Sequence, residues 1–161
     1  FIIKYPGEIP PNSTHTDLIN NIDIAPTLLD YAGIKSAENV QGKSYRKQLS
    51  TEENLRFRSS IYYHYYEYPF WHHVQPHYGI RNDRYKLIHF YFDIDQWELY
   101  DLKNDPDELE NLYHDPQYQS LIVKMKLELK ELQKEYGDDI SLDSMRVITK
   151  TNFGLIGGGN H

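Results

Sequence analysis

The stretch from His77 to Leu102 reads HYGIRNDRYKLIHFYFDIDQWELYDL, and it decides the fold of this chain. Its segments are rich in aromatic and β-branched residues and alternate between two faces, which is typical of strands. Asn82-Asp83 and the acidic segment after Phe92 separate them as turns. The pattern predicts an antiparallel meander whose middle strand is covered on both faces. The three predicted strands are residues 77–82, 85–92 and 97–102.

A fourth strand and a long helix are predicted on either side of this meander. Residues 61–68, IYYHYYEY, form the densest aromatic run and end at Pro69. After the meander, Asp115 and Pro116 supply an N-cap and a first-turn proline, and Gly137 supplies the C′ position. Between them lies an apolar stripe at helical spacing. The stripe consists of Tyr118, Leu121, Ile122, Met125, Leu129, Leu132 and Tyr136.

The first third of the chain reads differently. Residues 1–5, FIIKY, are a short apolar run typical of a buried strand, and residues 18–32 predict a helix that Asp23 caps and Gly33 ends. A short helix is expected at residues 44–49.

The predicted fold class is α+β. An antiparallel sheet of about four strands is packed by a long C-terminal helix, and a strand and a helix precede it. Residues 1–54 are expected to hold that strand, that helix and a connection, residues 55–138 the sheet-and-helix unit, and residues 139–161 an irregular tail.

Composition narrows the function classes. The chain has 161 residues with 39% hydrophobic and 14% aromatic residues, which is enough for a core. A net charge of −7 disfavours nucleic acid as a partner, since nucleic-acid binding requires clustered cations. The absence of cysteine excludes a disulfide framework and a thiolate site. No apolar run approaches the ~18 residues that a membrane span needs.

Histidines are the first candidates for chemistry. His72, His73 and His77 lie close together in sequence, and His64 and His89 are expected on neighbouring strands. Imidazole is a common metal ligand, but Pro76 breaks any helix that would align these side chains, and no carboxylate lies among them. The segment is therefore a plain aromatic-rich loop or a loop that contacts a polar ligand, and a metal site is the least favoured alternative. Its aromatic neighbours favour a sugar, which offers C–H faces and hydroxyls.

Charged residues give weaker signals. The acidic residues lack the spacing of a calcium-binding loop, so solvated turn carboxylates are expected. Arg81, Arg84 and Lys86 form a small positive edge that either holds an anionic group or pairs with the acidic turns. No phosphate-binding glycine loop and no nucleophile–base pattern occurs. The acidic residues in question are Asp93, Asp95, Glu98, Asp101, Asp105 and Asp107.

Several stretches together resemble type I sulfatases. The first is Asn21-Ile22-Asp23-Ile24-Ala25-Pro26-Thr27-Leu28-Leu29-Asp30-Tyr31-Ala32-Gly33-Ile34, which follows Tyr5-Pro6-Gly7-Glu8 and precedes Gln41-Gly42-Lys43-Ser44. The second is Gly79-Ile80-Arg81-Asn82-Asp83-Arg84-Tyr85-Lys86-Leu87-Ile88, with Trp97-Glu98-Leu99-Tyr100-Asp101-Leu102 and Asn104-Asp105-Pro106 after it. The order and spacing match over about residues 1–136. The segments YYHYYEYP and HYGIR look most similar to bacterial N-acetylglucosamine-6-sulfatases and glycosaminoglycan sulfatases.

The resemblance implies that this chain is the C-terminal portion of a larger enzyme. In the family, an alkaline-phosphatase-like α/β domain uses a formylglycine, made from Cys or Ser in a C/S-x-P-x-R motif, and a calcium ion. The resemblance implies that residues 1–54 are a strand-helix remnant at the end of that α/β domain. None of these motifs occurs here, so no catalytic residue and no metal ligand is carried over, and the chain alone is expected to be inactive. Its expected partners are the N-terminal catalytic domain of the parent chain and a sulfated carbohydrate. His77, with His73 or His72, is the predicted sugar contact.

Two other interpretations remain open from the sequence. One is a stand-alone carbohydrate-binding or interaction module, motivated by the aromatic residues at 62–71. The other is a fragment of a related phosphodiesterase or phosphonate hydrolase. The resemblance also implies a periplasmic or secreted parent, although no signal segment is present in these residues. If residues 1–5 are an inner strand, the chain starts in mid-strand, and it is expected to expose apolar surface and to self-associate.

Overall fold

The computed structural model describes residues 1–50, 55–68 and 73–157, with the backbone alone for residues 152–157. The chain divides into two compact units, Phe1–Ile61 and Tyr62–His161. No helix in the described part of the chain is both long and apolar enough to cross a membrane.

The first unit is built around η1 (Asn21–Asp23), α1 (Ile24–Tyr31) and α2 (Arg46–Leu49). Gly33 ends α1 with φ +70°, as expected. The Asp23 carboxylate does not cap α1. It is fully buried, accepts hydrogen bonds from the backbone N–H groups of Asn20 and Lys43, and pairs with Arg58 at 2.8 Å. Asp23 therefore joins three distant segments of this unit.

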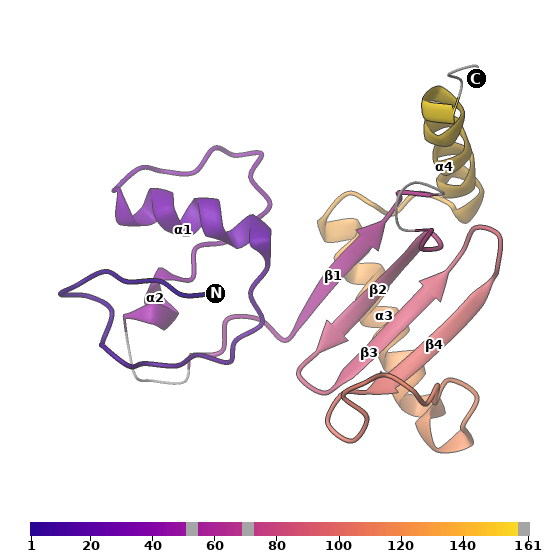
Figure 1. Ribbon diagram of the computed structural model, residues 1–161, viewed down its shortest axis with the longest axis horizontal. Coiled ribbons are helices and arrows are strands. Elements are labelled where there is room, and N and C mark those ends of the chain that lie inside the picture. The colour runs from indigo at the N-terminus through magenta and orange to yellow at the C-terminus, as the bar shows by residue number, and fades with distance from the viewer. Residues whose placement is uncertain (51–54, 69–72, 158–161) are drawn as a thin grey trace. The chain divides into compact units, whose positions relative to one another are not determined.

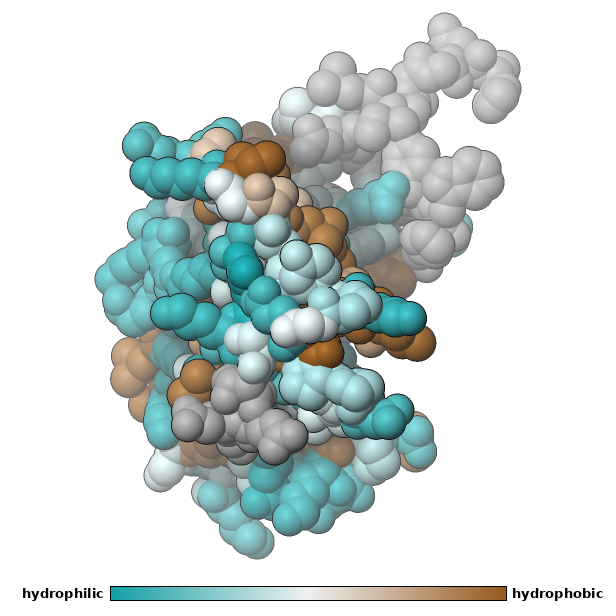
Figure 2. Space-filling view, turned by 90° about the vertical axis from the view of Figure 1, so that its left-hand side faces the viewer, coloured by the Kyte–Doolittle hydropathy of each residue, from teal (hydrophilic) through white to brown (hydrophobic). Residues whose placement is uncertain are grey.

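The predicted strand at residues 1–5 is wrong, because these residues have no regular secondary structure. A strand needs a hydrogen-bonding neighbour, and residues 6–50 and 55–59 of the first unit contain no strand. Phe1 and Ile2 are instead 74% and 96% exposed. Figure 2 shows apolar side chains at the surface among hydrophilic ones.

The second unit is a four-stranded antiparallel sheet with one face covered by a helix (Figure 1). The strands are β1 (Ser60–Tyr65), β2 (His77–Asn82), β3 (Tyr85–Phe90) and β4 (Gln96–Asp101), and they lie in the order β1-β2-β3-β4. The α+β class and the meander are thereby confirmed, with β3 shorter than predicted. In the register, Tyr78 faces His89 and Leu87 faces Leu99.

The long helix begins through η2 (Pro116–Tyr118) and continues as α3 (Gln119–Glu135). The Asp115 carboxylate accepts from the Gln117 backbone N–H at 2.8 Å, and Gly137 has φ +69°, so both predicted ends are confirmed. The apolar stripe packs on one face of the sheet and forms the core. Its buried members are Ile122, Met125 and Leu129, which cluster with Tyr78, Ile80, Leu87, Tyr91 and Leu99.

The expectation of an irregular tail at residues 139–161 is wrong, because α4 spans Leu142–Gly157. Its sequence has no clear apolar period, yet Met145 is 3% exposed and joins the core cluster of the second unit. In Figure 1, α4 stands at one end of the sheet. The helix depends on a few inward contacts rather than on a continuous stripe.

Candidate functional site

His77, the main predicted contact residue, opens β2 directly after the buried Pro76. Side chains alternate along a strand, so His77 lies on the opposite face from Tyr78 and Ile80. Those two residues pack in the core with α3. His77 therefore lies on the sheet face that α3 does not cover.

Aromatic rings hold His77 in place. The Tyr65 ring stacks on it with centroids 5.5 Å apart, and the rings of Phe90 and Tyr63 approach to 5.1 and 5.9 Å. The ring is half-buried by these contacts. Its orientation is consequently fixed by packing rather than by solvent.

One hydrogen bond determines the chemistry of the His77 ring. Nδ1 lies 2.8 Å from the backbone carbonyl oxygen of Gln75. A carbonyl only accepts, so Nδ1 carries the hydrogen and Nε2 of the neutral ring is an acceptor. Among the described residues, nothing occupies Nε2. The arrangement leaves one oriented nitrogen for a hydroxyl or amide donor.

Of the other two predicted contact residues, the structure describes only His73. His73 is exposed, with a left-handed φ of +47° that is uncommon outside glycine and asparagine. His72 lies outside the described residues. The structure thus assigns a position to His73 and His77.

His64 and His89 are removed from the candidate set because both are internal. His64 Nδ1 lies 2.6 Å from the Asp138 carboxylate and Nε2 lies 2.8 Å from the Tyr91 hydroxyl. Burial lowers the pKa of His64, against the opposing effect of Asp138. Side chains alternate along β3, which puts His89 on the core side with Leu87. This alternation is the sequence signal that distinguishes the internal His89 from His77 on the other face.

The charged edge is largely paired internally. Arg84 binds Asp101 through two nitrogens at 3.0 and 2.7 Å, and Lys86 binds Glu108 at 2.6 Å. The Arg84 hydrogen bond lowers the pKa of Asp101, which is 2% exposed. The expectation of solvated carboxylates is wrong for Asp101, because the register of β3 with β4 brings Arg84, in the turn before β3, next to it.

Among residues 1–50, 55–68 and 73–157, no group of three or more metal-ligating side chains converges. The family that this chain resembles uses a calcium ion, and this part of the chain offers no fitting set of ligands for it. We derive no step of a reaction through it.

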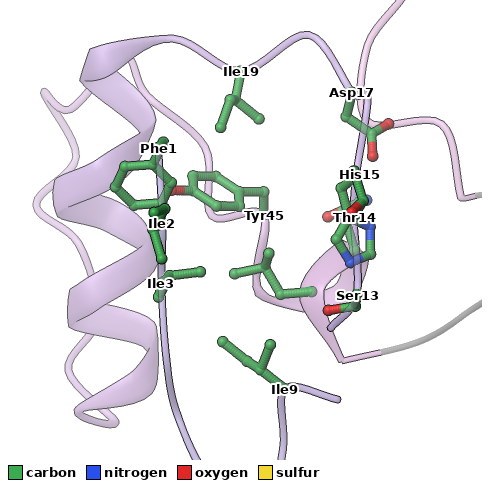
Figure 3. A pocket seen from close by; sticks show the side chains of 12 residues that line it. Phe1, Ile2, Ile3, Ile9, Ser13, Thr14, His15, Asp17, Ile19 and Tyr45 are labelled. Carbon is green, nitrogen blue, oxygen red and sulfur yellow. The ribbon is translucent and has the colours of Figure 1, made fainter. Parts of the chain in front are cut away.

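A pocket of about 490 Å³ lies in the first unit (Figure 3). Phe1, Ile2 and Ile3 contribute apolar side chains, while His15 and Asp17 contribute polar ones. Tyr45 is buried beside it, and burial raises the pKa of its phenol.

Comparison with known proteins identifies the sheet-and-helix architecture. The family model described as "N-sulphoglucosamine sulphohydrolase, C-terminal" matches residues 1–135. The chain belongs to this family. The match covers both units and ends with α3, so α4 of this sulfatase-family chain lies beyond it.

Two relatives illustrate the relationship. An N-acetylglucosamine-6-O-sulfatase from Bacteroides thetaiotaomicron is 44% identical over 140 residues, which are 86% of this chain and 25% of that protein. An ulvan-active sulfatase from Formosa agariphila is 29% identical over 189 residues, covering 92% of this chain and 31% of the relative. The chain thus spans between a quarter and a third of the length of these relatives.

Solved structures agree with this assignment. The structure of BT4656 in complex with its substrate D-glucosamine-2-N,6-O-disulfate is similar with a TM-score of 0.82 and 44% identity, over 86% of this chain and 28% of that chain. A phosphonate monoester hydrolase of Agrobacterium radiobacter is similar at a TM-score of 0.57 and 24% identity, over 71% and 24% of the two chains. That second likeness shows a shared fold alone.

Proposed function

We propose that this chain is the C-terminal portion of a sulfatase that hydrolyses sulfate esters on glucosamine residues of glycosaminoglycans. The 44% identity to an N-acetylglucosamine-6-O-sulfatase, which extends over 86% of this chain, carries the proposal. Residues 1–54 belong to the end of the catalytic domain and residues 55–138 form the C-terminal subdomain. The chain supplies structure and substrate selection to the parent enzyme.

The reaction chemistry is assigned to the preceding catalytic domain of the parent. The chain has no cysteine and no S-x-P-x-R motif. The parent's formylglycine and calcium ion are therefore placed in that domain, and the chain is expected to show no turnover alone. Turnover of a sulfate ester by the purified chain, free of the parent enzyme, would overturn this division.

His77 is the proposed substrate contact, and its tautomer defines what it recognises. With Nδ1–H donated to Gln75, Nε2 accepts a hydrogen bond from a sugar hydroxyl or amide. His73 and His72 precede it on the same approach to β2 and are proposed to border the same sugar. A neutral hydrogen bond contributes about 0.5–1.5 kcal/mol, so its loss corresponds to a roughly 2- to 13-fold change in binding.

Kinetics of the parent enzyme test both parts of the proposal. The substrates are D-glucosamine-2-N,6-O-disulfate, a 2-O-sulfated hexuronate and an ulvan oligosaccharide. We expect turnover of the first, and a His77→Ala variant with KM raised about 2- to 13-fold and little change in kcat. His114→Ala, which removes an exposed histidine, is the control. Turnover of the other substrates but not the glucosamine sulfate would refute the substrate assignment, and an unchanged KM would refute the role of His77.

The parent is proposed to act in the periplasm or outside the cell, where such polysaccharides are met. Separately, the exposed Phe1 and Ile2 side chains support self-association of the isolated chain. Light scattering of the purified chain tests this: we expect a mass above that of a 19.2 kDa monomer. A monomer at all concentrations would contradict it.

A further inference from the structure

The C-terminal helix α4 is an addition to the part of the chain that the family model matches, since that match ends at residue 135. Two of its side chains are almost fully buried against the second unit, Met145 at 3% and Thr149 at 2% exposure. Outward-facing Val147 is 61% exposed. Among the described side chains of α4, residues 142–151, few are buried, so single polar interactions matter for the docking of this part of the helix.

The main polar attachment of α4 is Arg146. Its Nε donates to the backbone carbonyl oxygen of Tyr91 at 2.7 Å, and its Nη2 lies 3.2 Å from Asp95 Oδ2. The other carboxylate oxygen, Oδ1, lies 2.8 Å from Nε2 of His89. One carboxylate thus connects a helix residue to a histidine on β3.

His89 is 2% exposed and stacks on the Trp97 ring with centroids 4.1 Å apart. Nδ1 lies 2.8 Å from the Tyr78 hydroxyl, which donates to it, and Nε2–H donates to Asp95. These two bonds use the full capacity of a neutral imidazole. A second proton, on Nδ1, would reverse the bond to Tyr78, so that the ring donates and the Tyr78 hydroxyl oxygen accepts.

The charges that face His89 come from three directions. Asp95 approaches from the β3–β4 turn, Lys126 from α3, and Arg146 from α4, where Asp143 lies 3.7 Å from Arg146. Burial lowers the pKa of His89 most, Asp95 opposes this, and the positive charges of Lys126 and Arg146 lower it further. A protonated His89 would leave two cations, itself and Arg146, sharing the Asp95 carboxylate.

We propose that α4 is an acid-sensitive strap, which stays docked while His89 is neutral and is released when His89 takes up a proton. Undocking removes the positive charge of Arg146 from the His89–Asp95 pair, so the undocked state binds the proton more tightly. By linkage, the proton must then favour undocking to the same extent. Docking is complete above the ordinary histidine pKa of about 6.5 and weakens as the pH falls below it. This inference does not depend on the proposed sulfatase activity.

Hydrogen exchange of the full-length protein tests the strap. Backbone amides of residues 142–157 are compared with those of α3 between pH 7.5 and 5.5, after correction for the intrinsic pH dependence of exchange. We expect the opening of α4 to increase by up to about tenfold per pH unit, the limit for one coupled proton, while α3 stays protected. A flat α4 profile, or loss of protection in α4 and α3 together, would overturn the proposal.

Two variants separate His89 from the other groups. His89→Gln keeps a side-chain amide but cannot gain a proton, and it should flatten the pH dependence of α4. Arg146→Gln should open α4 at pH 7.5 and reduce the pH dependence of its opening. This variant still tests the acid-sensitive docking of α4 if His89→Gln does not fold. His114→Gln, at an exposed site, should behave as wild type. A pH step that survives in His89→Gln, or a step of undiminished size in Arg146→Gln, would contradict the mechanism.

Discussion

Gly79 on β2 is the position where a single added carbon tests the packing beside His77. A Cβ built there would lie 2.5 Å from the Tyr63 hydroxyl oxygen and 2.6 Å from the Leu87 backbone carbonyl oxygen. Both distances are shorter than ordinary carbon contacts. The tyrosine can move, but the carbonyl belongs to the neighbouring strand and can move only with the sheet.

The change in the free energy of unfolding caused by Gly79→Ala follows from two opposing effects. Alanine is favoured over glycine within a strand by about 0.5–1 kcal/mol, because it has less conformational freedom to lose. Overpacking a tight site costs about 1–3 kcal/mol, and here one obstacle is backbone. The steric cost exceeds the entropic gain, so we expect Gly79→Ala to lower the free energy of unfolding by about 1–2 kcal/mol.

Urea unfolding followed by tryptophan fluorescence measures the change, with Trp97 reporting on the second unit. Repeating the substitution in a Tyr63→Ala background gives a double-mutant cycle. We expect the cost of Gly79→Ala to fall there but not to vanish, since the Leu87 carbonyl remains. A Gly79→Ala protein as stable as wild type would refute the packing argument, and a zero cost in the Tyr63→Ala background would refute the backbone part of it.

Three further substitutions test other parts of the second unit. Asp101→Asn should destabilise the protein at pH 7, and its difference from wild type should shrink as the pH falls below the ordinary aspartate pKa towards the lowered pKa of Asp101; urea unfolding at a series of pH values from 7 down to 3 checks this. Met125→Ala should cost about 2–5 kcal/mol in thermal unfolding, whereas Leu127→Ala on the exposed face of α3 should change stability by less than about 0.5 kcal/mol. Gly137→Ala should cost about 1 kcal/mol because of the left-handed φ, with Asn tolerated better; equal values for the two variants would contradict this.

The sequence predicted those elements whose signals are local. The meander follows from alternation and turn residues, and α3 from its stripe and from Asp115 and Gly137 at its ends. Residues 1–5 carried the same apolar signal as a strand, but strand formation also requires a partner that no local pattern specifies. For α4 the reverse holds, because the helix forms although its sequence carries no clear apolar signal. Few of its described side chains face inward, and its docking depends on Tyr91 and Asp95, which follow β3.

The candidate site was predicted only in part, for a related reason. Sequence proximity pointed to His77 and its neighbours, but it could not show that Gln75 fixes the tautomer or that Tyr65 stacks on the ring. Asp101 was misread because its partner Arg84 is reached through the register of the sheet. Interactions between strands are set by register, and register is a property of the assembled sheet.

The aromatic run at residues 61–68 bears on the interpretation as a stand-alone sugar-binding module. Alternation divides it between the two faces of β1. Tyr62 packs with the core and stacks on Tyr136, while Tyr63 and Tyr65 pack around His77. Their rings are thus engaged within the unit and do not form a free platform on which a sugar could stack. Of the tyrosines that motivated a binding module, Tyr63 and Tyr65 are better explained as the support that orients His77, which favours a single contact within a larger enzyme site.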